Sequence, residues 1–394
     1  MDFAHVALSP EDQEFFDQTR EFIAKHVTDE VRARDRRFGE NFDEQLHLAL
    51  GEAGYLDSDF HLESEGGFSP LRRRMFHLEI GRAQTPWYHW GTTSVVARLV
   101  QQFGVPELSE AVLPGVLSGE IRLCLGYTEP EGGSDVATCK TRAARDGDAW
   151  IINGSKMFTT GAHKSQYVFL ITNTDPEAPK HKSLTMFLVP LDSPGIEIQG
   201  MRTIDGDRTN IVFYSDVRVD DRYRIGPVNG GWGVLRGALD VEHGTVEKED
   251  DGLQRVAVMS EHLTLMAEAI DAIAALVTKR DADGRRLLDD TSVAYRLGRS
   301  VARTEAALST PGMFGRVANA QTMRDVSPDL MDILGTASAL PVDTEGAVDD
   351  GGAEYIFRLA SPVGIYGGTL EVFRNMIAQH ALGLGRPNYS PPRS

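Results

Sequence analysis

Cysteine, long apolar runs and an excess of positive charge are all missing from this sequence. Cys124 and Cys139 are the only cysteines among 394 residues, too few for a disulfide framework, which favours a reducing cytoplasm. No run of about 18 apolar residues is present, so we expect no transmembrane helix. The N-terminal residues include neither a basic segment nor an apolar one, and no signal peptide is expected.

The charge balance excludes two classes of partner. Lysine and arginine number 40 against 58 aspartates and glutamates, which gives a net charge of −18. Nucleic acids and anionic membranes are bound through basic surfaces, so neither is expected here. An anionic ligand would have to be held by local arginine, lysine and backbone donors. No metal site is predicted.

Two glycine- and hydroxyl-rich stretches lie close together in the middle of the chain. The first, LGYTEPEGGSDVA, covers residues 125–137 and ends a strand-like alternation in a turn with Gly133 and Ser134. Adjacent glycines let the backbone approach a ligand and expose N–H groups to it. The second, WIINGSKMFTTG, covers residues 150–161 and adds the hydroxyl of Thr160. Taken alone, either stretch also fits an ordinary polar turn of a sheet.

Together the two stretches resemble motifs of the acyl-CoA dehydrogenase family, flavoproteins that desaturate acyl-CoA thioesters between the α and β carbons. The matching residues are Thr128, Glu129, Pro130, Gly133, Ser134 and Asp135, then Asn153, Gly154, Lys156, Phe158 and Thr160. A third family motif, IYGGTLEVFRNMIAQHALGLGRP, covers residues 365–387. The resemblance extends over nearly the whole chain.

The resemblance implies FAD as cofactor, acyl-CoA as substrate, and an electron-transfer flavoprotein or similar acceptor as partner. It implies FAD contacts from Leu125, Tyr127, Thr128, Gly133, Ser134, Phe158, Thr159, Thr160, Thr369, Leu370 and Glu371. The substrate contacts that it implies come from Ser134, Asp240, His243, Gly367 and Gly368.

Hydrophobic periodicity divides the chain into three parts. Residues 1–120 show helical spacing after a Ser9-Pro10 helix start. Residues 121–230 alternate with a period of two, as strands do, over 149–152, 167–171, 183–189 and 209–214. Helical spacing returns over 231–394, at 253–277 and 292–308, with a last helical stretch over 351–384. We therefore predict an α+β fold with an N-terminal α-helical domain, a central antiparallel β-domain and a C-terminal domain like a four-helix bundle, which the resemblance also implies.

Desaturation requires a base for the α-proton, donors for the developing enolate and a flavin that accepts the β-hydride. In many family members the base is a glutamate directly before Gly-Thr in the third motif, where this chain has Gly367. Other members place the glutamate on the first helix after the β-domain, in a pattern that lines up with residues 231–242. The resemblance thus implies Glu242 as catalytic base, while the N–H of Gly367 remains as a donor to the thioester carbonyl.

One departure leaves alternatives open. The family usually has arginine after that glutamate, whereas this chain has His243 and Gly244. If the helix ends early, Glu247 and Glu249 are the other candidates for the base.

Two elements that bind the ADP half of a neighbour's FAD in the family, Arg-x-x-Phe-Gly and Gln-x-x-Gly-Gly, are not found. The corresponding regions read KRDADGRRLL at 279–288 and MDILGTA at 331–337. Either the chain forms a homo-oligomer that binds FAD differently, or a sister acyl-CoA dehydrogenase chain completes the site in an α2β2 assembly. The second arrangement resembles the two-subunit enzymes of actinobacterial steroid side-chain degradation, and it favours a bulky acyl-CoA as substrate.

Two other functions are compatible with this resemblance. A non-catalytic partner subunit would supply only interfaces, and the retained Glu242, Thr128, Ser134 and Thr160 argue against it. A flavin-dependent oxidase or monooxygenase on the same fold would not need a base that faces the flavin, so Glu242 argues against that as well.

Overall fold

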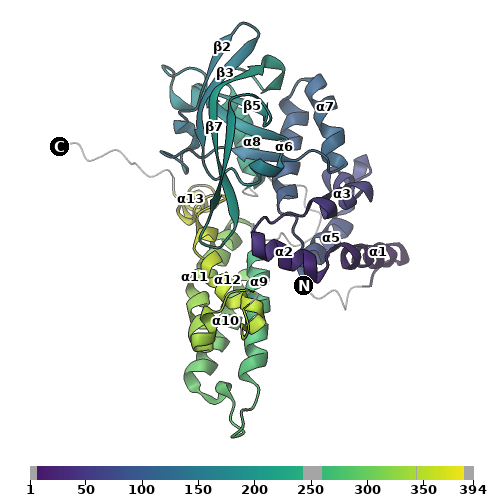
Figure 1. Ribbon diagram of the computed structural model, residues 1–394, viewed down its shortest axis with the longest axis vertical. Coiled ribbons are helices and arrows are strands. Elements are labelled where there is room, and N and C mark those ends of the chain that lie inside the picture. Colours follow the sequence, from purple (N-terminus) through teal and green to yellow (C-terminus); the bar gives the residue numbers. More distant parts are fainter. Residues whose placement is uncertain (1–6, 243–259, 343, 386–394) are drawn as a thin grey trace, which may run out of the picture. The chain divides into compact units, whose positions relative to one another are not determined.

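The computed structural model describes residues 7–242, 260–342 and 344–385, with side chains except at 238–242, 260 and 349 (Figure 1). The chain divides into two compact units. Of the described residues, the first unit holds those up to Val241 and the second holds Glu242 and those from 260 onward. Each unit has its own hydrophobic core.

The first unit begins with helices, as the apolar spacing predicted. Ser9 caps the first of them by accepting a hydrogen bond from the Asp12 N–H at 3.1 Å, and Pro10 takes the first helical position. The helices are α1 (Pro10–His26), α2 (Asp29–Phe38), α3 (Glu44–Glu52), α4 (Tyr55–Phe60), α5 (Pro70–Arg82), α6 (His89–Phe103) and α7 (Pro106–Leu117). Their buried side chains form one core that continues onto the sheet.

A sheet follows the helices in the same unit. Its strands are β1 (Leu123–Gly126), β2 (Arg142–Asp146), β3 (Ala149–Lys156), β4 (Tyr167–Asn173), β5 (Leu184–Pro190), β6 (Ile196–Arg202), β7 (Arg208–Asp220) and β8 (Arg224–Ile225). The strand order is β6-β7-β3-β2-β4-β5-β8, with β1 beside β4. Neighbours are antiparallel except that β1 and β2 run parallel to β4. Alternate residues of β4 enter different cores, Phe169 that of the helices and Val168 that of the opposite face, so the strand reads as a continuous apolar run.

Helix α8 (Gly231–Glu242) completes the first unit. Val234 and Leu235 are buried in the same core as Leu184 and Met186 of the sheet. Gly231 lies so close to the sheet that a Cβ there would be 2.8 Å from the Leu184 carbonyl oxygen. The start of α8 is therefore held tightly against β5.

The second unit is helical. Its helices are α9 (Ser260–Val277), α10 (Thr291–Leu308), α11 (Gly312–Leu334), α12 (Gly352–Leu359) and α13 (Leu370–Met376), with a π-helical turn at Ile377–Ala381. Side chains of α9, α11 and α12 share one core. The predicted fold class, with N-terminal helices, a central sheet and C-terminal helices, is confirmed.

Two features of the second unit were not predicted. The helical stretch predicted over 351–384 contains a break between Leu359 and Leu370, because Pro362 lacks an N–H and Gly367 and Gly368 adopt left-handed φ angles of 59° and 89°. Helix α11 was not expected at all. It carries Pro328 in its interior, and its polar and apolar residues follow no clear period.

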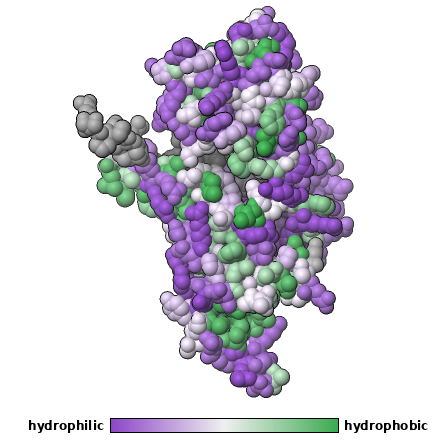
Figure 2. Space-filling model, turned by 60° about the vertical axis from the view of Figure 1, so that its left-hand side comes forward, coloured by the Kyte–Doolittle hydropathy of each residue, from purple (hydrophilic) through white to green (hydrophobic). Residues whose placement is uncertain are grey.

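None of the helices in the described ranges combines the length and the hydropathy of a membrane span. The face shown in Figure 2 is largely hydrophilic, and its apolar side chains form separate groups.

Candidate active site

The first two motifs lie against each other, beyond the ends of β1 and β3. The Met157 N–H donates to the Thr128 carbonyl at 2.8 Å, which joins one motif to the other. The turn after Thr128 is closed by two backbone hydrogen bonds between Glu129 and Gly132, of 2.9 and 3.1 Å. Gly133 lies beside the Thr128 side chain, since a Cβ there would be 3.4 Å from Thr128 Cγ2. The structure thus brings Thr128 close to the chain that leads into Phe158.

A buried ion pair underlies this junction. Lys156 Nζ lies 2.7 Å from Glu129 Oε1 and is completely buried. It also donates to the Tyr127 carbonyl at 3.3 Å. The Glu129 carboxylate accepts three further hydrogen bonds, from the N–H groups of Lys140 at 2.7 Å and Thr141 at 2.8 Å and from the Cys139 thiol at 3.2 Å. The ammonium of Lys156 and the N–H groups of Lys140 and Thr141 thus all donate to the Glu129 carboxylate.

The electrostatics of the pair follow from that geometry. Burial alone would raise the pKa of Glu129, but the charge and hydrogen bond of Lys156 and the two N–H donors outweigh it and lower the pKa to about 2. Cys139 lies 3.4 Å from Lys156 Nζ, and burial raises its thiol pKa to about 12. At neutral pH Glu129 is therefore ionised and Cys139 is protonated.

The loop of the second motif is held from β7. The Thr159 N–H donates to the Asn210 carbonyl at 2.9 Å, and Asn210 Nδ2 donates back to the Thr159 carbonyl at 3.0 Å. Thr160 Oγ1 lies 3.0 Å from Thr209 Oγ1. Directly before these anchored residues, Phe158 adopts a left-handed φ of 55° and exposes 52 % of its surface. An exposed aromatic ring in an unfavourable backbone conformation is a feature of ligand sites.

Two histidines, His163 and His89, lie against the loop of the second motif. His163 Nε2 lies 2.6 Å from Glu40 Oε2, while its Nδ1 accepts from Asn210 Nδ2 at 3.1 Å. The ring of His89 packs on Gly161, where a Cβ would lie 2.0 Å from the ring carbon Cε1. Burial lowers the pKa of His89 to about 4, so its ring is neutral at physiological pH. Only glycine fits at position 161.

The predicted base and its neighbours fall at the edge of what the structure describes. Glu242 is the last residue of α8, but its side chain and that of Asp240 are outside the description, and His243, Glu247 and Glu249 lie outside the described residues. The start of the helix is well anchored. The Asn229 N–H donates to Thr185 Oγ1 at 2.9 Å, and Thr174 Oγ1 donates to Asn229 Oδ1 at 2.6 Å.

The predicted residues of the third motif lie in the second unit, in the turn that leads into α13. Gly367 and Gly368 form the turn, and Thr369 caps α13 by accepting from the Val372 N–H at 3.2 Å. The Leu370 side chain is fully buried in the core, so only its backbone is left to face a ligand. The Glu371 side chain is 75 % exposed and lies 3.5 Å from Arg374.

Several residues that support the site were not found from the sequence. Glu40, His163, Thr209 and Asn210 were missed because their contacts depend on the packing of β7 and of the segment after α2 against the loop. Glu129 and Lys156 were read as motif residues, but their pairing was not predicted. Their opposite charges, buried in two adjoining motifs, were the one signal that pointed to it.

The chemistry of this donor set fits a flavin ring. The hydroxyls of Thr128 and Thr160 suit a polar ring edge, the exposed ring of Phe158 suits a flat aromatic face, and the Thr159 hydroxyl is buried without a partner in the described part of the chain. The residues of the two motifs are therefore able to hold the ring of FAD.

The loop at 279–288 was expected to correspond to a region that faces a neighbour's FAD, and its arginines make contacts within the loop itself. Arg285 pairs with Asp283 and Arg286 with Asp289, each at 2.6 Å. Arg280 donates to the Gly284 carbonyl in the same loop. The arginines of this loop thus have their partners within their own segment.

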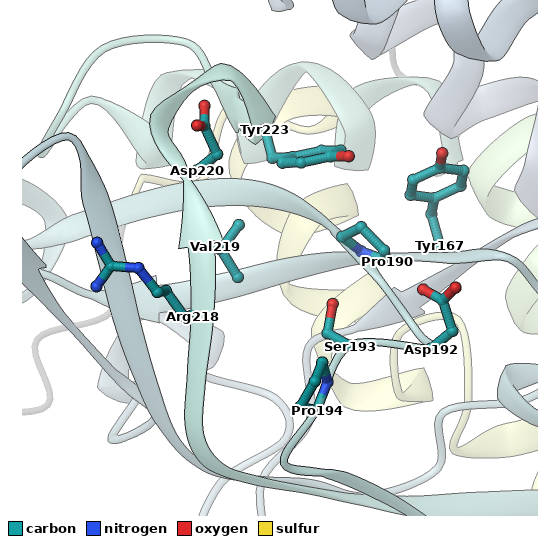
Figure 3. A pocket seen from close by; sticks show the side chains of 9 residues that line it. All are labelled: Tyr167, Pro190, Asp192, Ser193, Pro194, Arg218, Val219, Asp220 and Tyr223. Atoms are coloured by element: carbon teal, nitrogen blue, oxygen red, sulfur yellow. The ribbon is translucent and has the colours of Figure 1, made fainter.

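A separate hollow of about 480 Å³ lies beside β4, β5 and β7 (Figure 3). It is lined by Tyr167 and Tyr223, whose ring centres are 6.4 Å apart, together with prolines, Asp192 and Asp220. None of the predicted site residues lines it. Its mixed, charged lining differs from the largely apolar pockets that bind acyl chains.

Two family models match this sequence. The acyl-CoA dehydrogenase N-terminal domain matches residues 9–120, and the acyl-CoA dehydrogenase middle domain matches residues 124–218. Among curated proteins, the acyl-CoA dehydrogenase IpdE1 of Mycobacterium tuberculosis is 31 % identical over 95 % of this chain and 98 % of its own length. The acyl-CoA dehydrogenase FadE26 of the same organism is 29 % identical over 97 % and 99 %.

Solved structures show the same similarity. A chain of the Tcur3481-Tcur3483 steroid ACAD superposes with a TM-score of 0.82 at 28 % identity, covering 98 % of this chain and 100 % of its own. A chain of the ChsE4-ChsE5 complex from Mycobacterium tuberculosis gives a TM-score of 0.80 at 27 % identity, covering 97 % and 100 %.

Proposed function

This chain belongs to the acyl-CoA dehydrogenase family, and on that premise we propose that it desaturates an acyl-CoA thioester between Cα and Cβ. Enzymes of this family are oxidoreductases that act on CH–CH bonds with FAD as cofactor. The observation that carries the proposal is the buried Glu129–Lys156 pair, which holds the two motifs together so that Thr128 adjoins the Phe158 loop.

The protein groups divide the reaction among them. Glu242 takes the α-proton onto its carboxylate, and the N–H of Gly367 donates to the thioester carbonyl, where charge develops in the enolate. When bound, FAD supplies the acceptor for the β-hydride, which leaves a Cα=Cβ double bond in the acyl chain. Thr128 and Thr160 would donate hydrogen bonds to the edge of the flavin ring, and Phe158 would pack against one of its faces.

The remaining predicted contacts belong to the same proposal. FAD is further bound by Leu125, Tyr127, Gly133, Ser134, Thr159, Thr369, Leu370 and Glu371. The acyl-CoA is bound by Ser134, Asp240, His243 and Gly368.

The structural relatives and the loop arginines together favour an assembly with a sister chain. Both of the solved structures described above combine two different chains, and one of them is a steroid enzyme by its name. In this chain the arginines of the 279–288 loop are paired within their own segment. We infer an α2β2 assembly with two FAD in total and a bulky, ring-bearing acyl-CoA as substrate.

The test is anaerobic flavin reduction. The chain is produced with its co-encoded sister chain and mixed with octanoyl-CoA or with 3-cyclohexylpropanoyl-CoA. Bleaching of the flavin and an enoyl-CoA product lighter by two hydrogens are expected, and the ring-bearing probe should react faster. If FAD is tightly bound but neither probe bleaches it or exchanges its α-protons with deuterated water, the chain is a non-catalytic partner. Equivalent consumption of oxygen in air would instead identify an oxidase.

A further inference from the structure

Arg316 carries a permanent charge and yet has no exposed surface. It lies on α11, and its Nη2 donates to three carbonyl oxygens: those of Val363 at 2.7 Å, Tyr366 at 2.8 Å and Gly368 at 3.2 Å. Arginine is never deprotonated in a protein, so its burial is costly unless such acceptors surround it. A single side chain therefore binds the connection between α12 and α13 at three points.

Because the peptide bond is planar, these contacts also fix the direction of the Gly367 N–H. In a trans peptide unit the C=O and the N–H point in opposite directions. Because the Tyr366 carbonyl points at Arg316, the Gly367 N–H that belongs to the same unit points away from it. No hydrogen-bond partner for this N–H is found in the described part of the chain. The free donor is aimed away from the guanidinium and toward the other side of the turn.

The rest of the turn is consistent with this orientation of the Gly367 N–H. Left-handed φ angles at Gly367 and Gly368 allow the carbonyls on both sides to reach the same guanidinium. The Tyr366 side chain is held separately, with its Oη 2.7 Å from His262 Nε2 of α9. Two adjacent glycines have the greatest freedom of any backbone pair, so an ordered turn at this point depends on outside contacts.

We propose that Arg316 is a positioning residue, which fixes the Gly367 N–H in the direction that binds the thioester carbonyl. This inference rests on the proposed function. It also explains how the turn keeps its geometry although glycine stands where many relatives have a glutamate side chain.

The test compares three variants of the FAD-loaded protein, purified with its sister chain. Arg316→Met removes the donors, and Arg316→Lys keeps the charge but places its ammonium about one bond short of the Nη2 position from which all three carbonyls are reached. Arg324→Met is the matched control. Arg324 lies on the same helix and also binds carbonyls of this connection, those of Ala360 at 3.4 Å and Ser361 at 3.2 Å, but none next to Gly367.

Two measurements test whether Arg316 positions the Gly367 N–H. Amide hydrogen exchange of Ile365 and Tyr366, whose N–H groups bond to the Pro362 carbonyl, should accelerate by about tenfold or more in Arg316→Met and stay at the wild-type rate in Arg324→Met. With 3-cyclohexylpropanoyl-CoA, kcat of Arg316→Met should fall by ~10–100-fold at unchanged KM, because the lost alignment matters most in the transition state. Arg316→Lys should give exchange rates and a kcat between those of the wild-type protein and Arg316→Met. If the methionine variant does not fold, the lysine variant replaces it in both measurements.

Wild-type exchange at Ile365 and Tyr366 in a folded Arg316→Met protein would overturn the inference. So would a loosened turn that leaves kcat unchanged. If the wild-type protein binds FAD but turns over neither acyl-CoA probe, the proposed function fails, and the role of Arg316 toward a substrate carbonyl fails with it. In that case accelerated exchange would still show that Arg316 holds the turn.

Discussion

Replacing Lys156 by methionine tests whether the buried ion pair holds the two motifs in place. Methionine keeps an unbranched apolar stem and removes the ammonium that lies 2.7 Å from Glu129. The Glu129 carboxylate would keep the N–H donors of Lys140 and Thr141 but would be buried without a countercharge at that distance. The folded state, and with it the junction of Thr128 and Phe158, should lose stability.

Two routes give a similar magnitude. Removal of one partner from a buried ion pair typically costs about 3–5 kcal/mol. The pKa of Glu129 offers a second figure, because it lies at about 2 instead of 4.5. At about 1.4 kcal/mol for each pKa unit, the folded state favours the ionised form by roughly 3 kcal/mol. We expect Lys156→Met to lower the free energy of unfolding by about 3 kcal/mol at neutral pH.

The stability lost in Lys156→Met should depend on pH, in a direction set by the lowered pKa of Glu129. A depressed folded-state pKa contributes stability that is complete above the unfolded value of 4.5 and is lost as the pH falls toward 2. In Lys156→Met the unpaired carboxylate is relieved once it takes up a proton. The difference between the wild-type protein and the variant should therefore be largest at neutral pH and shrink as the pH falls below 4.5.

The assay is urea unfolding followed by far-UV circular dichroism at neutral and acid pH. Lys180→Met is the matched control, since Lys180 pairs with Asp135 in the first motif but both side chains are about half exposed, at 48 % and 50 %. Such a surface pair contributes about 1 kcal/mol or less. Glu129→Gln and the Glu129→Gln/Lys156→Met double variant complete the cycle and isolate the interaction between the two residues. If Lys156→Met loses no more stability than Lys180→Met, or if the loss is the same in acid, the pair does not hold the motifs together.

The remaining predictions concern the proposed chemistry. Glu242→Gln should retain FAD and lose at least ~10²–10⁴-fold in flavin reduction by acyl-CoA, since it removes only the base; bleaching at the wild-type rate would shift the assignment to Glu249. Thr160→Val should slow flavin reduction by an amount equivalent to about 0.5–1.5 kcal/mol, whereas Thr209→Val, which removes only its hydroxyl neighbour 3.0 Å away, should have the smaller effect. The chain purified alone should bind FAD weakly, and with its sister chain should form α2β2 with two FAD by solution mass and flavin content. A homotetramer of this chain alone with one tight FAD per protomer would contradict that expectation.

The fold class was predictable because its signals are local. The strand-like apolar segments predicted at 167–171 and 183–189 correspond to β4 and β5, and the Ser9-Pro10 start corresponds to the cap of α1. The break between α12 and α13 was also locally encoded, in Pro362 and the glycine pair at 367–368. The prediction named only a helical stretch over 351–384 and did not place the break.

The support of the site was not predictable in the same way. Glu129 and Lys156 are 27 residues apart, and Asn210 is 51 residues from Thr159. Their contacts depend on the order and register of the strands, above all on the pairing of β3 with β7. Motif similarity predicted which residues meet a ligand, while the residues that hold them in place required the three-dimensional arrangement. The side chain of Glu242 lies outside the description, so its role stays a prediction.

The two cysteines make the chain a reporter of its own local opening. Both lie in the first unit, Cys124 on β1 and Cys139 against the Glu129–Lys156 pair, and burial raises the pKa of each thiol to about 12. The thiolate is the nucleophile that attacks a thiol reagent, so neither sulfur reacts until the surrounding structure opens and exposes it. Thiol labelling of the native protein therefore measures how often the motif-bearing unit opens. Cys139 is the more local probe, since it becomes reactive only when the contacts around Lys156 come apart.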